Sequence, residues 1–193
     1  MSKAVLISIR PKWCDLIASG QKTVEVRKTR PQLTIPFKVY VYCSKGKDKL
    51  ITIIRDGDEN YGDVYHGKDI FVKGAESGFY YGNHGKVIGE FICDAISPLT
   101  FDRAGIPTLH YLGIAKNWTT CLTVQEAIKY CGDTEKHGLF GWHISDLVIY
   151  DKPKELGEFR SWNTGVVFEG GYPMPTHKTK RPPQSWCYVE DLT

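Results

Sequence analysis

The sequence predicts a mixed α+β fold that is mainly β, a small β-barrel with attached helices. Segments with the two-residue alternation of strands outnumber helical patterns. The opening strand–helix–strand pattern is also too compact to repeat as a series of parallel crossovers. A chain of 193 residues with 41% hydrophobic residues suits one globular domain of ordinary size. We therefore expect residues 1–193 to form a single barrel-centred domain.

The first expected elements are a strand, a short helix and a second strand. Apolar and smaller residues alternate over residues 4–9, which predicts the first strand. Pro11 suits the first turn of a helix, and apolar residues then recur from Trp13 at spacings of three and four. Gly20 is expected to cap the end of this helix. The β-branched residues that follow favour extended backbone over residues 22–27.

Later in the chain, alternation and capping signals predict further elements. Thr123 and Glu126 form a capping box, so we expect a helix that runs to about Cys131. Further strands are expected over residues 37–43, 86–96, 142–150 and 185–190. Along the first of these, one face should hold Phe37, Val39, Val41 and Cys43.

Two segments differ in composition from this core pattern. Residues at about 46–84 are rich in glycine, aspartate and lysine, and one short apolar patch gives their only strong strand signal. We interpret them as an insertion that contains a hairpin. Residues at about 157–193 begin with a loose Gly/Pro stretch, which we interpret as a C-terminal extension.

Net charge and hydropathy limit the function classes. A formal charge of +3 is mild beside that of proteins that coat nucleic acid, so any phosphate-binding surface must be local. The longest apolar runs are too short to span a bilayer, and no charged-then-apolar segment opens the chain. We expect no membrane interaction and a cytoplasmic location.

The cysteines and histidines give no metal-binding pattern. Six cysteines are scattered without a CxxC pair, and Cys43 and Cys93 fall within apolar strand patterns. We expect reduced core thiols rather than disulfides. The six histidines show neither HExxH nor His-x3-His spacing. No metal and no cofactor are therefore expected.

The stretch GQKTVEVR places Lys22, Glu25 and Arg27 within six positions of one expected strand. Two-residue alternation puts Glu25 and Arg27 on the same face. In one interpretation these residues line a cleft, where Arg27 holds Glu25 ionised and Lys22 stays free for a phosphate or carbonyl oxygen. In the other they form an ion-pair ladder on the surface, which contributes little energy.

Residues of the preceding turn and helix are further candidates. Arg10 and Lys12 lie where a strand becomes a helix, and helix N-terminal amides attract anions. Ordinary solvated charge explains them equally well. Trp13 could anchor the helix in the core or form a wall on which a base stacks.

The same residues carry a family resemblance. The stretch ISIRPKWCDLIASGQKTVEVR resembles the opening of the activating-signal-cointegrator homology (ASCH) family, and FKVYVYCSK and KVIGEFICDAI are similar to its core strands. The family signature Gly-x-Lys-x-x-Glu-x-Arg is matched by Gly20, Lys22, Glu25 and Arg27, after the similar Pro11 and Trp13. The resemblance implies a PUA-like open β-barrel with flanking helices and a cleft.

The resemblance also implies a function. Members of the ASCH family are thought to bind or act on RNA. The resemblance therefore implies that the partner is single-stranded RNA or a nucleoside-like ligand such as a modified nucleoside. The expected ligand-binding residues are Arg10, Lys12, Trp13, Lys22, Glu25, Arg27, Ser44 and Lys45, of which the last two follow a strand that the resemblance places beside the cleft.

Two other function classes stay open. Some family members resemble ribonucleases or amidohydrolases of acylated cytidine, in which case Lys22 and Glu25 would be catalytic. Lys22 would then need a lowered pKa to act as base or nucleophile. In the amidohydrolase pattern a threonine stands where this chain has Glu25, which weakens that alternative. The third class is a protein-interaction adaptor with a degenerate cleft.

A basic stretch near the C-terminus is an auxiliary candidate. HKTKR, residues 177–181, precedes two prolines, and Trp186 and Tyr188 follow. Cations next to aromatic residues are typical of proteins that bind single strands, although such runs are also solvated loops. The insertion contains several tyrosines that could cap the cleft or contact another protein.

Overall fold

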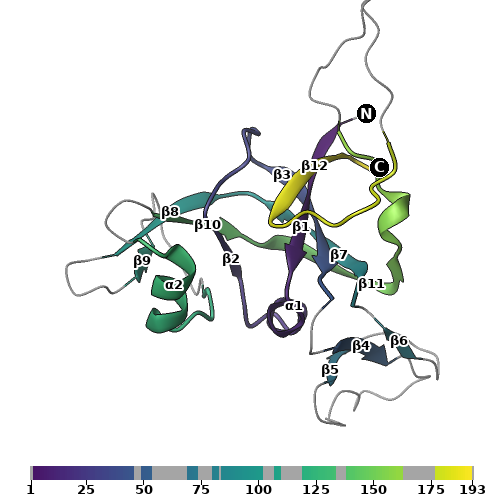
Figure 1. Cartoon of the computed structure of the whole chain (residues 1–193), viewed down its shortest axis with the longest axis horizontal. Helices are drawn as coiled ribbons and strands as arrows, with labels where there is room; N and C mark the ends of the chain where they lie inside the picture. Colours follow the sequence, from purple (N-terminus) through teal and green to yellow (C-terminus); the bar gives the residue numbers. More distant parts are fainter. Residues whose placement is uncertain are drawn as a thin grey trace, which may run out of the picture.

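The computed structural model describes most of the chain, with gaps. It covers residues 2–45, 49–53, 69–73, 80–82, 84–101, 107–109, 119–133, 138–162 and 177–192. Over these residues the protein is mainly β, with two α-helices and a mixed arrangement of sheets (Figure 1). The predicted α+β, mainly β fold class is confirmed.

A five-stranded sheet forms the larger layer, in the order β11-β7-β3-β1-β12. Its strands are β1 (Lys3–Ile9), β3 (Phe37–Cys43), β7 (Lys86–Cys93), β11 (Ser145–Lys154) and β12 (Trp186–Glu190). β1 and β3 pair in parallel, and the other neighbours are antiparallel. The parallel pair is possible because α1 (Pro11–Ala18) and β2 (Val24–Arg27) lie between the two strands in the chain.

A second, antiparallel sheet has the order β2-β10-β8-β9. It adds β10 (Leu139–His143), β8 (Ile96–Phe101) and β9 (Pro107–Leu109) to β2. The main core cluster joins the two sheets, since it combines side chains of β1, β3 and β7 with Trp142 of β10. The described strands form separate sheets and no closed ring.

Strand β3 shows how the sequence pattern creates two cores. Phe37, Val39 and Val41 lie in the main cluster, and Cys43 lies with them. Tyr40 belongs to a second cluster on the opposite face. The predicted alternation is therefore confirmed, and both faces of this central strand are covered.

Two expected strands are each divided where the chain passes from one sheet to the other. The strand expected over residues 86–96 ends as β7 and restarts as β8, and the one expected over 142–150 is divided between β10 and β11. At this corner the Asp94 carboxylate lies 2.6 Å from His143 Nδ1, and the His143 amide donates to Ala95. The sequence does not reveal such a change of sheet, because the run of strand-forming residues continues across the corner.

The expected insertion contains a third sheet of order β5-β4-β6. Its strands are β4 (Lys49–Ile53), β5 (Asp69–Lys73) and β6 (Tyr80–Gly82), and α1 contacts both β4 and β5 (Figure 1). The hairpin prediction is wrong for the first two strands, because β4 and β5 are parallel. A parallel pair needs a crossover connection instead of a tight turn.

Both predicted helices are present. In α1, Cys14 and Ile17 are buried in the main core, and Gly20 follows the C-cap Ser19 with φ +74°. The second helix is α2 (Val124–Cys131), and its predicted capping box forms between Thr123 and Glu126. A short 3-10 helix, Leu156–Glu158, follows β11.

The state of the cysteines agrees with the reduced thiols that the sequence predicts. All six cysteines are free, and four of them are buried. Burial raises the pKa of Cys93 to about 12, so this thiol stays protonated at neutral pH. Neither described helix is long and apolar enough to cross a membrane.

The α2 capping box should make stability depend on pH. The pKa of Glu126 is lowered, first by the Thr123 backbone N–H that it accepts and then by Lys12. A carboxylate with a lowered folded-state pKa stabilises the fold above its ordinary pKa of 4.5, and this contribution is lost as the pH falls through the folded-state value. We expect the melting temperatures of the wild type and Glu126→Gln to differ at neutral pH and to converge on acidification. Parallel curves across the acidic range would contradict this expectation.

Candidate functional site

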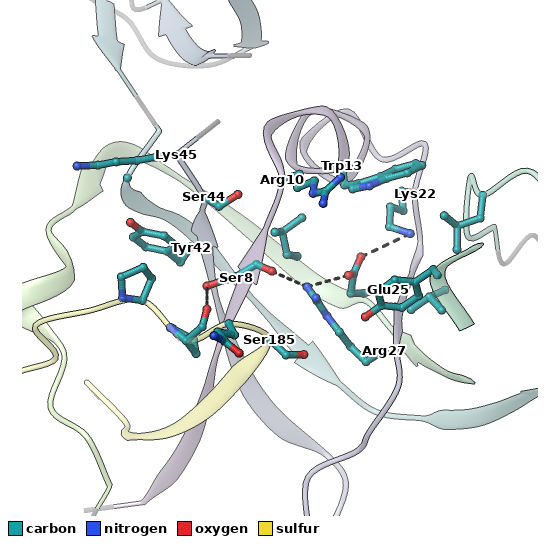
Figure 2. A pocket seen from close by; sticks show the side chains of 18 of the residues that line it. Ser8, Arg10, Trp13, Lys22, Glu25, Arg27, Tyr42, Ser44, Lys45 and Ser185 are labelled. Atoms are coloured by element: carbon teal, nitrogen blue, oxygen red, sulfur yellow. Dashed lines mark hydrogen bonds and ion pairs between the residues drawn. The ribbon is translucent and has the colours of Figure 1, made fainter. Parts of the chain in front are cut away.

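A pocket of about 1020 Å³ opens between the two sheets, α1, α2 and the C-terminal segment (Figure 2). Residues from the β1–α1 turn, β2 and the end of β3 line one part of it. Residues of α2 and of segment 180–185 complete the wall. Seven of the eight candidate residues line this pocket: Arg10, Trp13, Lys22, Glu25, Arg27, Ser44 and Lys45.

Strand β2 and the residues just before it carry the charged trio Lys22, Glu25 and Arg27 into the pocket wall. Glu25 Oε1 lies 3.0 Å from Arg27 Nη2, and Glu25 Oε2 lies 3.5 Å from Lys22 Nζ. The three side chains are only 2%, 7% and 10% exposed in chain order. The interpretation of the trio as a solvated surface ladder is therefore wrong. The carboxylate is instead shared between two buried cations.

Lys22 differs from its predicted role. Its Nζ donates to the carbonyl oxygens of Val24 at 2.8 Å and Thr120 at 2.5 Å, besides its ion pair with Glu25. The ammonium thus faces three acceptors of the protein. The sequence analysis had instead predicted that it stays free for a ligand. A buried ammonium must replace its hydration with protein acceptors, and the segment at 119–120 supplies one. Burial lowers the pKa of Lys22, and Glu25 opposes that effect.

Arg27 links two strands at the base of the pocket. Its Nη2 donates to the Ser8 carbonyl at 2.7 Å as well as meeting Glu25 (Figure 2). Its Nε is buried without a hydrogen-bond partner. Because Lys22 binds Thr120 and Arg27 binds Ser8, the trio joins β2 to β1 and to the segment before α2. The predicted pairing of Arg27 with Glu25 is confirmed.

The location of Trp13 fits both of its predicted roles. The half-buried side chain packs against the main core cluster and also lines the pocket. Lys22 Nζ lies 5.2 Å from the ring centroid, and Lys12 Nζ lies 4.4 Å from it. An indole fixed in this way presents a rigid aromatic surface to the pocket.

Lys12 is the candidate that the structure leaves outside the pocket lining. Its side chain is 59% exposed and its Nζ lies 3.1 Å from Glu126 Oε1. Lys12 therefore braces α1 against the capping box of α2.

The remaining cations of the pocket are exposed rather than paired. Arg10, Lys45, Lys129 and Lys180 line it, and among the described residues none of the four has a carboxylate partner. Arg10 is the N-cap residue of α1 and Lys129 belongs to the last turn of α2. These four residues are called the basic rim below. Their charges remain available to an anionic ligand.

The C-terminal segment also forms a wall of the pocket. In the sequence, only the composition of the HKTKR stretch indicated this role. The Thr179 amide donates to the Phe159 carbonyl at 2.7 Å, and Ser8 Oγ donates to the Pro183 carbonyl at 2.6 Å. These two bonds hold the segment across the pocket, with Lys180 between them. The HKTKR stretch thus contributes one residue to the lining. Tyr42 and Tyr130, which also line the pocket, were not identified from the sequence.

Together the fold and the pocket define an open, mainly β domain with a charged and aromatic cleft between its sheets. No family model matches the sequence, and no curated protein matches it. The structure is similar to that of ASCH from Zymomonas mobilis, with 16% identity and a TM-score of 0.47, over 97% of this chain and 88% of that one. Two variants of that protein match at 15% and 14% identity, with TM-scores of 0.48 and 0.46, over 98% and 97% of this chain and 92% and 89% of theirs. These neighbours carry the name of the family that the signature resembles.

Proposed function

We propose that the pocket binds single-stranded RNA, with an unstacked or modified base held inside it. The observation that carries this proposal is the combination of aromatic side chains with the basic rim in one cleft. Trp13, Tyr42 and Tyr130 line the same pocket as the four cations of the basic rim. Stacking of bases on aromatic rings and contact of the backbone with cations are the two usual components of single-strand binding.

The charge distribution supports an anionic ligand. Six cationic side chains and two carboxylates line the pocket, although the whole chain carries a formal charge of only +3. Part of that charge is internal, because Glu25 is held between Lys22 and Arg27. The basic rim supplies the rest. Positive charge is thus concentrated where a phosphodiester backbone would pass, as the mild net charge requires.

The site also favours a single strand over a duplex. A base can stack on Trp13 only when it has left its own helix, because the ring lies within a pocket and partly against the core. Paired bases in an A-form helix present their edges in a narrow major groove that side chains do not enter. The proposal therefore includes a preference for unpaired nucleotides.

The geometry around Lys22 favours binding over catalysis. A general base or nucleophile needs a nitrogen lone pair, but Lys22 Nζ donates to two carbonyl oxygens and meets Glu25. Its lowered pKa is the feature that the ribonuclease and amidohydrolase alternatives would use. Recovery of intact RNA after prolonged incubation is the expected result, and time-dependent cleavage would favour the ribonuclease.

Binding should depend on salt and on Trp13. We expect a labelled single-stranded oligoribonucleotide to bind more tightly at low than at high ionic strength, and more tightly than a duplex of the same sequence. Trp13→Ala should weaken binding by about 10-fold to 100-fold, since base–aromatic stacking contributes about 1–3 kcal/mol. Fluorescence anisotropy at two ionic strengths measures both effects.

The control for this substitution is Trp162→Ala. Trp162 lies outside the pocket lining, with Lys3 Nζ 5.4 Å from its ring centroid. This variant should bind RNA as the wild type does. Absence of binding at low salt, or a preference for duplex, would overturn the proposed function and leave the adaptor alternative.

A further inference from the structure

Lys45 and Gly85 meet at one end of the pocket. Lys45 follows β3, and Gly85 lies in the turn before β7; both line the pocket. A Cβ atom on Gly85 would lie 2.7 Å from Lys45 Cε and 3.3 Å from Lys45 Cγ. The lysine stem therefore passes directly over the glycine, and a side chain at position 85 would displace it.

The backbone under this lysine is fixed. The Gly85 amide donates to the Cys43 carbonyl at 2.7 Å, and the Ser44 amide donates to the Ile9 carbonyl at 2.8 Å. Gly85 has φ +82°, a conformation that side chains rarely adopt. The turn thus presents a surface without a side chain to the Lys45 stem.

Among the described residues, no carboxylate neutralises the charge of Lys45. The neighbouring Lys86 pairs with Glu155 at 3.0 Å, whereas Lys45 has no acidic partner in the part of the chain that the structure describes. Lys180, which lines the same pocket, also lacks one there. In Figure 2, Lys45 lies at the end of the pocket away from Trp13 and Lys22.

We propose that Lys45 and Lys180 form a phosphate-binding subsite of the pocket and that Gly85 positions Lys45 within it. The subsite takes a phosphodiester of the strand whose base lies at the Trp13 end. This inference rests on the proposed function. It adds how the bound strand lies along the pocket, with a base at the Trp13 end and a phosphodiester at the Lys45 end. Lysine suits this task, because it meets a phosphate as a point charge on a flexible stem that the glycine surface confines.

Salt titrations of single-stranded RNA binding test the subsite. Lys45→Gln and Gly85→Ala should each weaken binding by about threefold or more and lower the slope of log affinity against log salt by about 0.7, the value for one lost phosphate contact on a single strand. The double variant should bind no more weakly than Lys45→Gln alone, because both substitutions remove the same contact.

Gly132→Ala is the matched control for backbone strain. Gly132 has φ +86°, but a Cβ atom there would meet nothing within 4 Å. This variant carries the same kind of strain without displacing a lysine, so its affinity and salt slope should equal those of the wild type. Melting curves establish that each variant is folded, and Lys45→Gln tests the contact even where Gly85→Ala does not fold.

Inorganic pyrophosphate separates this inference from the proposed function. Chemical-shift changes at Ser44, Lys45 and Gly85 on titration, absent in Lys45→Gln, would support the subsite even if RNA did not bind. RNA binding with an unchanged affinity and salt slope in Lys45→Gln would overturn the subsite and leave the proposed function intact. Additive losses in the double variant would overturn the positioning role of Gly85.

Discussion

Glu25→Gln is expected to lower the free energy of unfolding by about 3–5 kcal/mol, the range for removing one partner of a buried ion pair. The glutamine keeps the shape of the side chain but removes the negative charge between Lys22 and Arg27. Both cations are almost completely buried, so water cannot replace the lost carboxylate. The backbone acceptors at Val24, Thr120 and Ser8 would then be the main compensation for two positive charges.

Urea denaturation measures this effect, with an unchanged m-value as the test that both variants unfold from comparable states. Glu155→Gln is the control, because it removes the carboxylate from an exposed ion pair with Lys86. Such a pair contributes at most about 1 kcal/mol. An equally small loss for Glu25→Gln would mean that the trio contributes no more than a surface pair.

Local sequence patterns were sufficient for individual elements. The alternation in β3 and the capping box of α2 depend on residues within a few positions of one another, and both were predicted correctly. Position 25 was also predicted to pair with Arg27, because alternation brings residues i and i+2 of a strand to one face. These contacts follow from backbone geometry alone.

Contacts between distant segments could not be predicted in the same way. One of the two carbonyl oxygens that accept a hydrogen bond from Lys22 Nζ belongs to Thr120, 98 positions away in the chain. Lys12 and Lys45 look equivalent in the sequence, but α2 supplies a carboxylate to the first and the structure shows none for the second. Whether a cation remains for a ligand therefore depends on the distant segment that packs beside it. The local spacing that defines the signature does not contain this information.

The trio has consequences for how binding and stability are related. In the sequence analysis Lys22 was expected to contact the ligand and Arg27 to serve the scaffold. In the structure both cations hold the scaffold, and the basic rim carries the cations for which the described residues supply no carboxylate. Stability and ligand binding should thus be separable by mutating the rim, whereas substitutions in the trio should affect both.

Lys22→Met is accordingly expected to destabilise the fold by about 3 kcal/mol, because two carbonyl acceptors lose their donor at a cost of about 1–3 kcal/mol each. Methionine has a similar length and is apolar, so the loss reflects the missing ammonium rather than a large cavity. The Thr23 and Val24 amides, which donate to the Thr119 carbonyl, should exchange with solvent faster, since the lysine no longer holds this segment against β2. Hydrogen exchange and urea denaturation measure the two effects.

Lys12→Met is the matched control, because it makes the same substitution at a lysine whose only described ion pair is exposed. It should cost no more than about 1 kcal/mol and leave the exchange of these amides unchanged. RNA binding by Lys22→Met should fall together with its stability, because the wall that carries Trp13 and Glu25 loses its support at Thr120. A fully stable Lys22→Met variant with weakened binding would instead return Lys22 to the role of a ligand contact, and would show that the Thr120 bond contributes little to the fold.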